Sequence, residues 1–150
     1  MLVLCCGNAH RGDDGAGILA ARRLREMGID AREHDGEALS LIESWRGMDE
    51  VMLVDAVVTG KRQGTVSVWD ALSAPLTGRP LLSSSHALGL AEAVQLARTL
   101  GWLPHRLTLY GIEARQFEFG TQPSKAVLRG VERAARRIHE YCTHQRGPAV

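Results

Sequence analysis

The chain has 150 residues, of which 18 are basic and 17 acidic, for a formal net charge of +1. This near-neutral balance creates no strong attraction to nucleic acid or to an anionic membrane, so neither is expected as a partner. The length is that of one domain, and we expect residues 1–150 to fold as a single unit. The three cysteines form neither a disulfide framework nor a spaced zinc motif. The opening apolar run is too short for a leader, and no apolar stretch reaches the length of about 20 residues that spans a bilayer, so a reduced, cytoplasmic protein is expected.

Short apolar runs alternate along the chain with segments of helical period. This alternation predicts an α/β fold of three layers, αβα, with a mostly parallel central sheet of about five strands. Residues 64–70 alternate between polar and apolar, which favours an antiparallel strand at the sheet edge. The expected strands are 2–6, 31–34, 51–55, 64–70 and 106–112, and the expected helices are 14–27, 40–46, one that begins at His86, and 123–141.

The segment between the first strand and the first helix is the most informative one. Residues 6–17 read CGNAHRGDDGAG, so that glycines frame two adjacent carboxylates, Asp13 and Asp14. In an open α/β fold this is the loop at the carboxyl end of the first strand, where ligands bind. The usual occupant of such a loop is a phosphate. Two carboxylates would repel a phosphate, and they favour a cation instead.

Three titratable residues stand where this architecture places a crevice. Asp14 lies at the start of the first helix, Asp55 ends an apolar strand, and His86 opens a helix after a serine-rich loop. A helix N-terminus favours an ionised carboxylate and a neutral imidazole. Two carboxylates and one imidazole form an incomplete ligand set for a divalent transition ion, with positions left for water or substrate. These ligand types do not separate nickel from zinc.

Each of these residues also has a structural interpretation. Asp13 and Asp14 could cap the helix that follows them. Asp55 could be an ordinary strand-end residue, and His86 a surface residue beside an N-cap at Ser85. We expect the other histidines to face solvent: His10, His34, His105, His139 and His144.

Other familiar catalytic patterns are missing. A dinucleotide fingerprint would need glycine where Cys5 and His10 stand, and the chain has no Walker-type phosphate loop. Ser83 to Ser85 lack the glycine framing of a nucleophile elbow. Cys5 and Cys6 are neighbours on a strand and are interpreted as small buried residues, so serine or cysteine hydrolase chemistry has little support.

Taken together, these segments resemble the maturation endopeptidases of nickel-iron hydrogenases. The matching motifs follow the family's order over nearly the whole chain. They are GN at 7–8, GDDGAG at 12–17, LVDA at 53–56, GTV at 64–66, SHALGL at 85–90, LP at 103–104 and LYGIE at 109–113.

The resemblance implies a compact three-layer fold and one proteolytic event. Such enzymes remove a C-terminal extension from the precursor of the hydrogenase large subunit after nickel is inserted. The family's metal-contacting acid, strand-end aspartate and histidine fall on Asp14, Asp55 and His86. These would be the catalytic and metal-contacting residues, reading nickel supplied by the substrate, with no permanently bound cofactor. A metal-polarised carbonyl or a metal-activated water would carry hydrolysis. The small size of the chain favours a monomer.

Two positions depart from the family's pattern. Cys5 stands where the family usually has glycine, and Glu37-Ala38 replace the glycine and threonine that usually follow Asp35-Gly36. The second departure bears on substrate preference. Two other functions therefore stay open. One is a non-catalytic, metal-dependent maturation chaperone or adaptor on the same fold. The other is a self-contained metallohydrolase of small substrates, which would bind metal tightly by itself.

Overall fold

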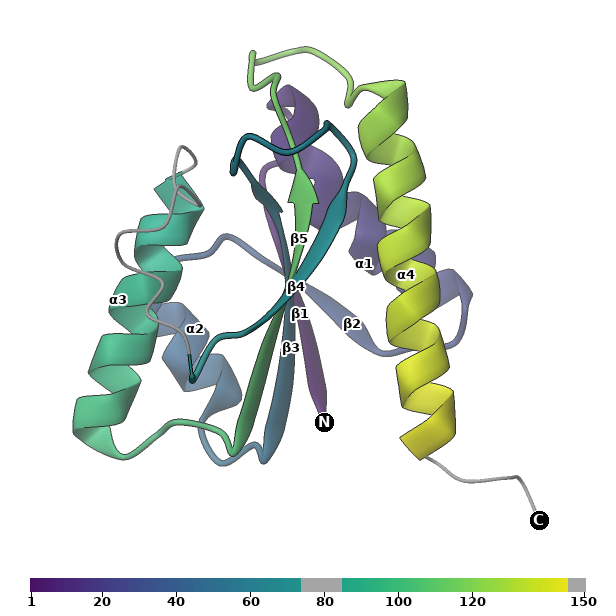
Figure 1. The fold of residues 1–150 in the computed structure, drawn as a ribbon. Helices are drawn as coiled ribbons and strands as arrows, with labels where there is room; N and C mark the ends of the chain where they lie inside the picture. The colour runs from purple at the N-terminus through teal and green to yellow at the C-terminus, as the bar shows by residue number, and fades with distance from the viewer. Residues whose placement is uncertain (74–84, 146–150) are drawn as a thin grey trace.

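The computed structural model describes residues 1–73 and 85–145, and the side chains of residues 85–88 lie outside the described part. Its centre is a five-stranded sheet in the order β2-β1-β3-β5-β4 (Figure 1). All neighbouring strands are parallel except β4, which runs antiparallel to β5 at one edge. The strands are β1 (Leu2–Cys6), β2 (Ala31–His34), β3 (Glu50–Val57), β4 (Val66–Asp70) and β5 (Arg106–Glu113). The predicted mostly parallel sheet with an antiparallel edge strand is confirmed.

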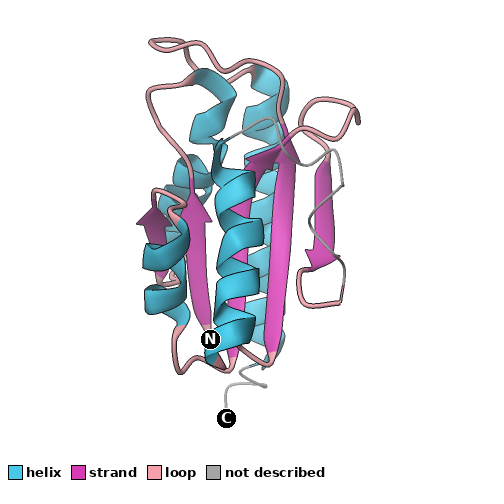
Figure 2. Cartoon of the chain, turned by 90° about the vertical axis from the view of Figure 1, so that its left-hand side faces the viewer, coloured by secondary structure: helices cyan, strands magenta, loops and turns pink. Residues whose placement is uncertain are grey.

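Helices cover both faces of the sheet, as the alternation of elements predicts. They are a 3-10 turn η1 (Gly12–Gly15), α1 (Ala16–Glu26), α2 (Ala38–Trp45), α3 (Ser85–Leu100) and α4 (Lys125–Gln145). The helices α1 and α4 pack on one face, and α2 and α3 pack on the other (Figure 1). Figure 2 looks onto the α2/α3 layer, with the strands behind it.

The central strand β3 shows why the sequence folds this way. Met52 and Val54 pack toward α1 and α4, while Leu53 and Val57 pack toward α2 and α3. A parallel strand that is covered on both faces needs apolar side chains at both parities. Each such side chain contributes about 1.5–3 kcal/mol when it is fully buried.

Two element boundaries differ from the prediction in ways that affect the site. The first helix is preceded by η1, so Asp14 lies in a 3-10 turn and α1 begins only at Ala16. The strand β3 continues through Val57 because its last residues still pair with β5, Ala56 with Ile112 and Val57 with Glu113. Asp55 is therefore not the last residue of its strand, which corrects the prediction.

The strand order creates a topological switch between β1 and β3. From β1 the chain crosses to β2 on one side, and β3 then pairs with β1 on the other side. In open α/β sheets, ligands bind at the carboxyl ends of the strands where the winding direction reverses. Asp14 and Asp55 both lie at this edge of the sheet.

Candidate functional site

Two glycines allow the start of α1 to lie directly on the ends of β1 and β3. A Cβ atom at Gly17 would lie 2.0 Å from the carbonyl oxygen of Cys6 and 3.0 Å from that of Val54. A Cβ atom at Gly7 would lie 2.3 Å from the carbonyl oxygen of Asp14. Real Cβ atoms do not approach backbone this closely, so these positions need glycine if the turn is to close over the strand ends.

Backbone hydrogen bonds fold residues 8–14 into a compact turn. The N–H of Asn8 donates to the carbonyl of Asp14 at 3.0 Å, and the N–H of Arg11 donates to the carbonyl of Asn8 at 3.3 Å. The side chain of Asn8 accepts a bond from the N–H of His10 at 2.9 Å, as in an Asx turn. The position of the Asp14 backbone is thus set by local bonds.

The carboxylate of Asp14 is completely buried in this turn, with 0% of the residue exposed. Nη1 of Arg11 lies 4.0 Å from its Oδ2 and supplies a nearby positive charge. Arg11 is in turn held by a hydrogen bond from Nε to the carbonyl of Phe117 at 3.1 Å, and by stacking on the Phe117 ring. A buried carboxylate needs such compensation, because removing an anion from water is costly.

Asp55 lies on β3, the strand that pairs with β1, and is 7% exposed. It alternates with Leu53 and Val57, whose side chains pack toward α2 and α3, so it belongs to that face of the sheet. Its Oδ1 accepts a bond from the N–H of Ala56 at 2.8 Å. Burial, and then the negative charge of Asp55, raise the pKa of the Cys6 thiol on the neighbouring strand.

His86 lies in the first turn of α3, but its side chain is outside the described residues. The backbone nonetheless places that turn at the same edge of the sheet. A Cβ atom at Gly89 would lie 2.5 Å from the carbonyl oxygen of Gly36, which follows the carboxyl end of β2. The structure therefore brings the start of α3 to the face that carries Asp55.

Asp13 has a role that the sequence did not reveal. It is fully buried, and it accepts four hydrogen bonds that come from outside its own turn. The donors are the backbone N–H groups of Arg115, Gln116 and Ser124 and the side-chain amide of Gln63, at 2.8–3.1 Å. The N-cap of α1 is Gly15, without a side-chain cap, so the helix-capping interpretation of Asp13 is wrong. Asp13 instead joins the η1 turn to the β3–β4 loop and to the segment between β5 and α4.

These bonds also set the acidity of Asp13. Burial by itself would raise the pKa of the carboxyl group. The bonds from Ser124, Arg115, Gln116 and Gln63 favour the ionised form and together lower the pKa below its usual value of 3.8. Asp13 is therefore an ionised structural acceptor.

The expectation that His34 faces solvent is wrong. Only 9% of its side chain is exposed. Nδ1 accepts a bond from the N–H of Gly36 at 2.8 Å, and Nε2 lies 3.1 Å from the hydroxyl of Ser40. Because Nδ1 acts as an acceptor, the proton belongs on Nε2, which donates to Ser40. His34 thus fixes the loop between β2 and α2.

Glu37, which departs from the family's pattern, caps the N-terminus of helix α2. Its carboxylate oxygens accept bonds from the N–H groups of Leu39 at 3.0 Å and Ser40 at 2.9 Å. This explains why α2 begins at Ala38, two residues earlier than predicted.

The cysteines are all buried, as expected for Cys5 and Cys6. Burial raises the pKa of Cys5 to about 12, so its reactive thiolate is scarce at neutral pH. Within residues 1–73 and 85–145, the described side chains form no group of three or more His, Cys, Asp or Glu residues able to hold a metal ion. No helix in the same part of the chain is long and apolar enough to cross a membrane.

The strand order and the site define a doubly wound α/β protein with two buried carboxylates at its switch point. Comparison with known proteins narrows this class. The family model described as hydrogenase maturation protease matches residues 35–141. The hydrogenase expression/formation protein HupD of Rhizobium leguminosarum is 30% identical over 140 residues, covering 90% of this chain and 69% of HupD. Protein FrxA of Pyrococcus furiosus is 28% identical over 125 residues, covering 82% of this chain and 90% of FrxA.

Solved structures agree on the fold. The hydrogenase maturating endopeptidase HybD from E. coli superimposes with a TM-score of 0.80 at 24% identity, covering 97% of this chain and 93% of that one. The [NiFe] hydrogenase maturation protease HybD from Thermococcus kodakarensis gives a TM-score of 0.78 at 24% identity, covering 93% and 97%. The chain belongs to the hydrogenase maturation protease family, a family of endopeptidases.

Proposed function

We propose that this protein removes the C-terminal extension from the nickel-loaded precursor of a hydrogenase large subunit. Membership of the maturation protease family supports the reaction class and the kind of substrate. The observation that carries the proposal is the pair of buried carboxylates at the switch point, Asp14 in the η1 turn that follows β1 and Asp55 on the adjacent strand β3.

In this proposal the nickel that the substrate carries is recognised by direct contact with Asp14, Asp55 and His86. Carboxylate oxygens and a neutral imidazole are ligands that a divalent transition ion accepts. A crevice with only these ligands leaves coordination positions for substrate atoms, so the nickel arrives with the precursor and is no resident cofactor. The metal then polarises the scissile carbonyl or activates a water. Cleavage would thus depend on nickel loading.

The buried setting of Asp14 suits this task. In a crevice shielded from water, the attraction between a carboxylate and a divalent cation is stronger than at an exposed surface. The Arg11 guanidinium, 4.0 Å from Asp14, balances the negative charge before the substrate arrives. We further propose that residues 1–150 act as one unit and as a monomer.

The test is the intact mass of a cognate large-subunit precursor, nickel-loaded or nickel-free, after incubation with the protein. We expect a defined C-terminal loss only with nickel. Asp14→Asn, Asp55→Asn and His86→Ala should each slow it by roughly a hundredfold or more. Matched controls are Asp49→Asn and His105→Ala, whose side chains are 91% and 88% exposed.

Other outcomes separate the competing functions. An unchanged precursor mass together with nickel-dependent complex formation would establish the chaperone or adaptor instead. Full processing by the Asp14 and His86 variants would contradict the residue assignment. Tight binding of nickel by the isolated protein would favour a self-contained metallohydrolase.

A further inference from the structure

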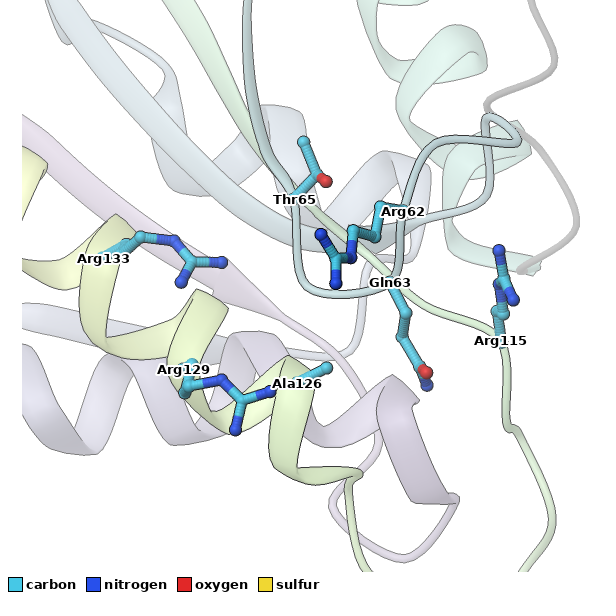
Figure 3. Close-up of a pocket in the computed structure, with 7 residues that line it drawn as sticks. All are labelled: Arg62, Gln63, Thr65, Arg115, Ala126, Arg129 and Arg133. Carbon is cyan, nitrogen blue, oxygen red and sulfur yellow. The ribbon is translucent and has the colours of Figure 1, made fainter.

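A cavity lined by arginines lies near the η1 turn and has no role in the chemistry described above. It has a volume of about 460 Å³ and lies between the β3–β4 loop, the segment after β5 and α4 (Figure 3). Its charged lining consists of Arg62, Arg115, Arg129 and Arg133. Guanidinium groups that gather in one hollow repel each other, and the hollow concentrates their positive potential.

The described acidic side chains near this cluster bind other groups. Among the residues that the structure describes, no ion pair forms with Arg62, Arg115 or Arg129. Glu132 on α4 is held by Nε of Arg23 at 2.9 Å. Glu113 at the end of β5 accepts a bond from the N–H of Thr59 at 2.8 Å.

The walls of the cavity are fixed by close backbone packing. A Cβ atom at Gly64 would lie 2.2 Å from the carbonyl oxygen of Ala126, and one at Gly130 would lie 2.5 Å from that of Gly64. Nη2 of Arg133 donates to the carbonyl of Gly64 at 2.7 Å. The loop and the helix therefore form a preformed receptor, which reduces the entropy lost on binding.

We propose that this basic cavity binds carboxylates of an acidic segment of the protein substrate, outside the cleaved bond. The inference rests on the proposed function. Arginines bind carboxylates through paired N–H donors, and here they come from three different elements, which suits several carboxylates along a peptide. The lining includes no aromatic ring among the described residues, so a nucleobase would find no stacking surface.

Gln63 connects the cavity to the η1 turn. It lines the cavity, and its amide donates to Oδ2 of Asp13 at 2.8 Å and to Oγ of Ser124 at 2.9 Å. Asp13 is followed directly by Asp14. A substrate held in the basic cavity would thus lie near the turn that carries Asp14.

The experiment compares precursor processing by the wild-type protein and by the double variant Arg62→Gln/Arg129→Gln. Arg133 is left intact because it supports the backbone. The control is Arg22→Gln/Arg98→Gln, which removes the same charge from exposed positions on α1 and α3. We expect the cavity variant to raise KM about tenfold with kcat within twofold, and to lose most of the salt dependence of KM. A KM equal to that of the control would overturn the proposal.

If the wild-type protein processes no precursor, the proposed function fails and the cavity is tested by itself. Hexaglutamate, inorganic phosphate and a single-stranded RNA oligomer are titrated while the backbone amide signals of Thr65 and Ala126 are followed by NMR. Shifts with hexaglutamate that vanish in the cavity variant support the site. Tighter binding of phosphate or RNA, or no shift with hexaglutamate, refutes it.

Discussion

The side-chain amide of Gln63 donates a hydrogen bond to Oδ2 of Asp13 at 2.8 Å, across 50 positions of sequence. This contact joins the β3–β4 loop to the turn that carries Asp14. Through Asp13 the same network reaches the backbone N–H groups of Arg115, Gln116 and Ser124. One buried carboxylate therefore organises the region between the η1 turn and the basic cavity.

Replacing Asp13 with asparagine should destabilise the protein by roughly 2–4 kcal/mol. Oδ1 accepts from Ser124 and Oδ2 accepts from Gln63, Arg115 and Gln116. An asparagine has only one acceptor oxygen, so its NH₂ group must face N–H donors on one side. Urea unfolding monitored by circular dichroism measures the change. Asp30→Asn, at a side chain that is 83% exposed, should change stability by less than about 0.5 kcal/mol. An Asp13→Asn variant as stable as that control would contradict the stabilising role of the hydrogen bonds to Asp13.

The contribution of Asp13 should also depend on pH. Its pKa is lowered in the folded state, so the ionised form stabilises the fold fully above the unfolded pKa of about 3.9. This stabilisation is lost as pH falls through the lower, folded pKa. The difference in unfolding free energy between wild type and Asp13→Asn should be constant from pH 7 to 5 and should shrink below about pH 4. Urea midpoints at a series of pH values test this, and a difference that does not change down to pH 3 would be inconsistent with it.

Replacing Gly17 with alanine should disrupt the site by steric conflict. The added Cβ would lie 2.0 Å from the carbonyl oxygen of Cys6, which belongs to a central strand and has little room to move. Overpacking of this kind costs about 1–3 kcal/mol or more. Gly15→Ala is the matched control, because its Cβ would have 3.4 Å to its nearest neighbour at Ala9 and its φ is −76°. Thermal unfolding of the two variants should differ clearly, and equal melting temperatures would refute the close-packing argument.

Removing the carboxylate of Glu37 should weaken α2 without changing catalysis. Its two bonds to Leu39 and Ser40 satisfy N–H groups at the start of that helix, so Glu37→Ala should cost about 1 kcal/mol. Glu37→Asp keeps a capping carboxylate and should recover most of this loss. Stability and precursor KM are measured for both variants. A large change in KM with little change in stability would show that Glu37 contacts substrate and is more than a cap.

Local patterning was sufficient to predict much of the fold. The strands at 2–6 and 31–34 were predicted with the bounds that the structure has. The strand expected at 51–55 is the central strand β3, whose apolar side chains pack on both faces of the sheet. The antiparallel edge strand followed from the alternation in 64–70, although β4 begins at Val66.

The sequence by itself thus determined the class of fold, the family and the placement of Asp14 and Asp55 at the carboxyl edge of the sheet, since these follow from periodicity and local motifs. Only the tertiary structure decided the role of Asp13, the burial of His34 and the gathering of arginines beside α4. The partners of Asp13 lie 50 to 111 positions away along the chain. The arginines of the cavity come from segments that are adjacent only after β4 pairs with β5 and α4 packs on the sheet. Contacts of that range leave no period or motif in the sequence, because folding alone brings their partners together.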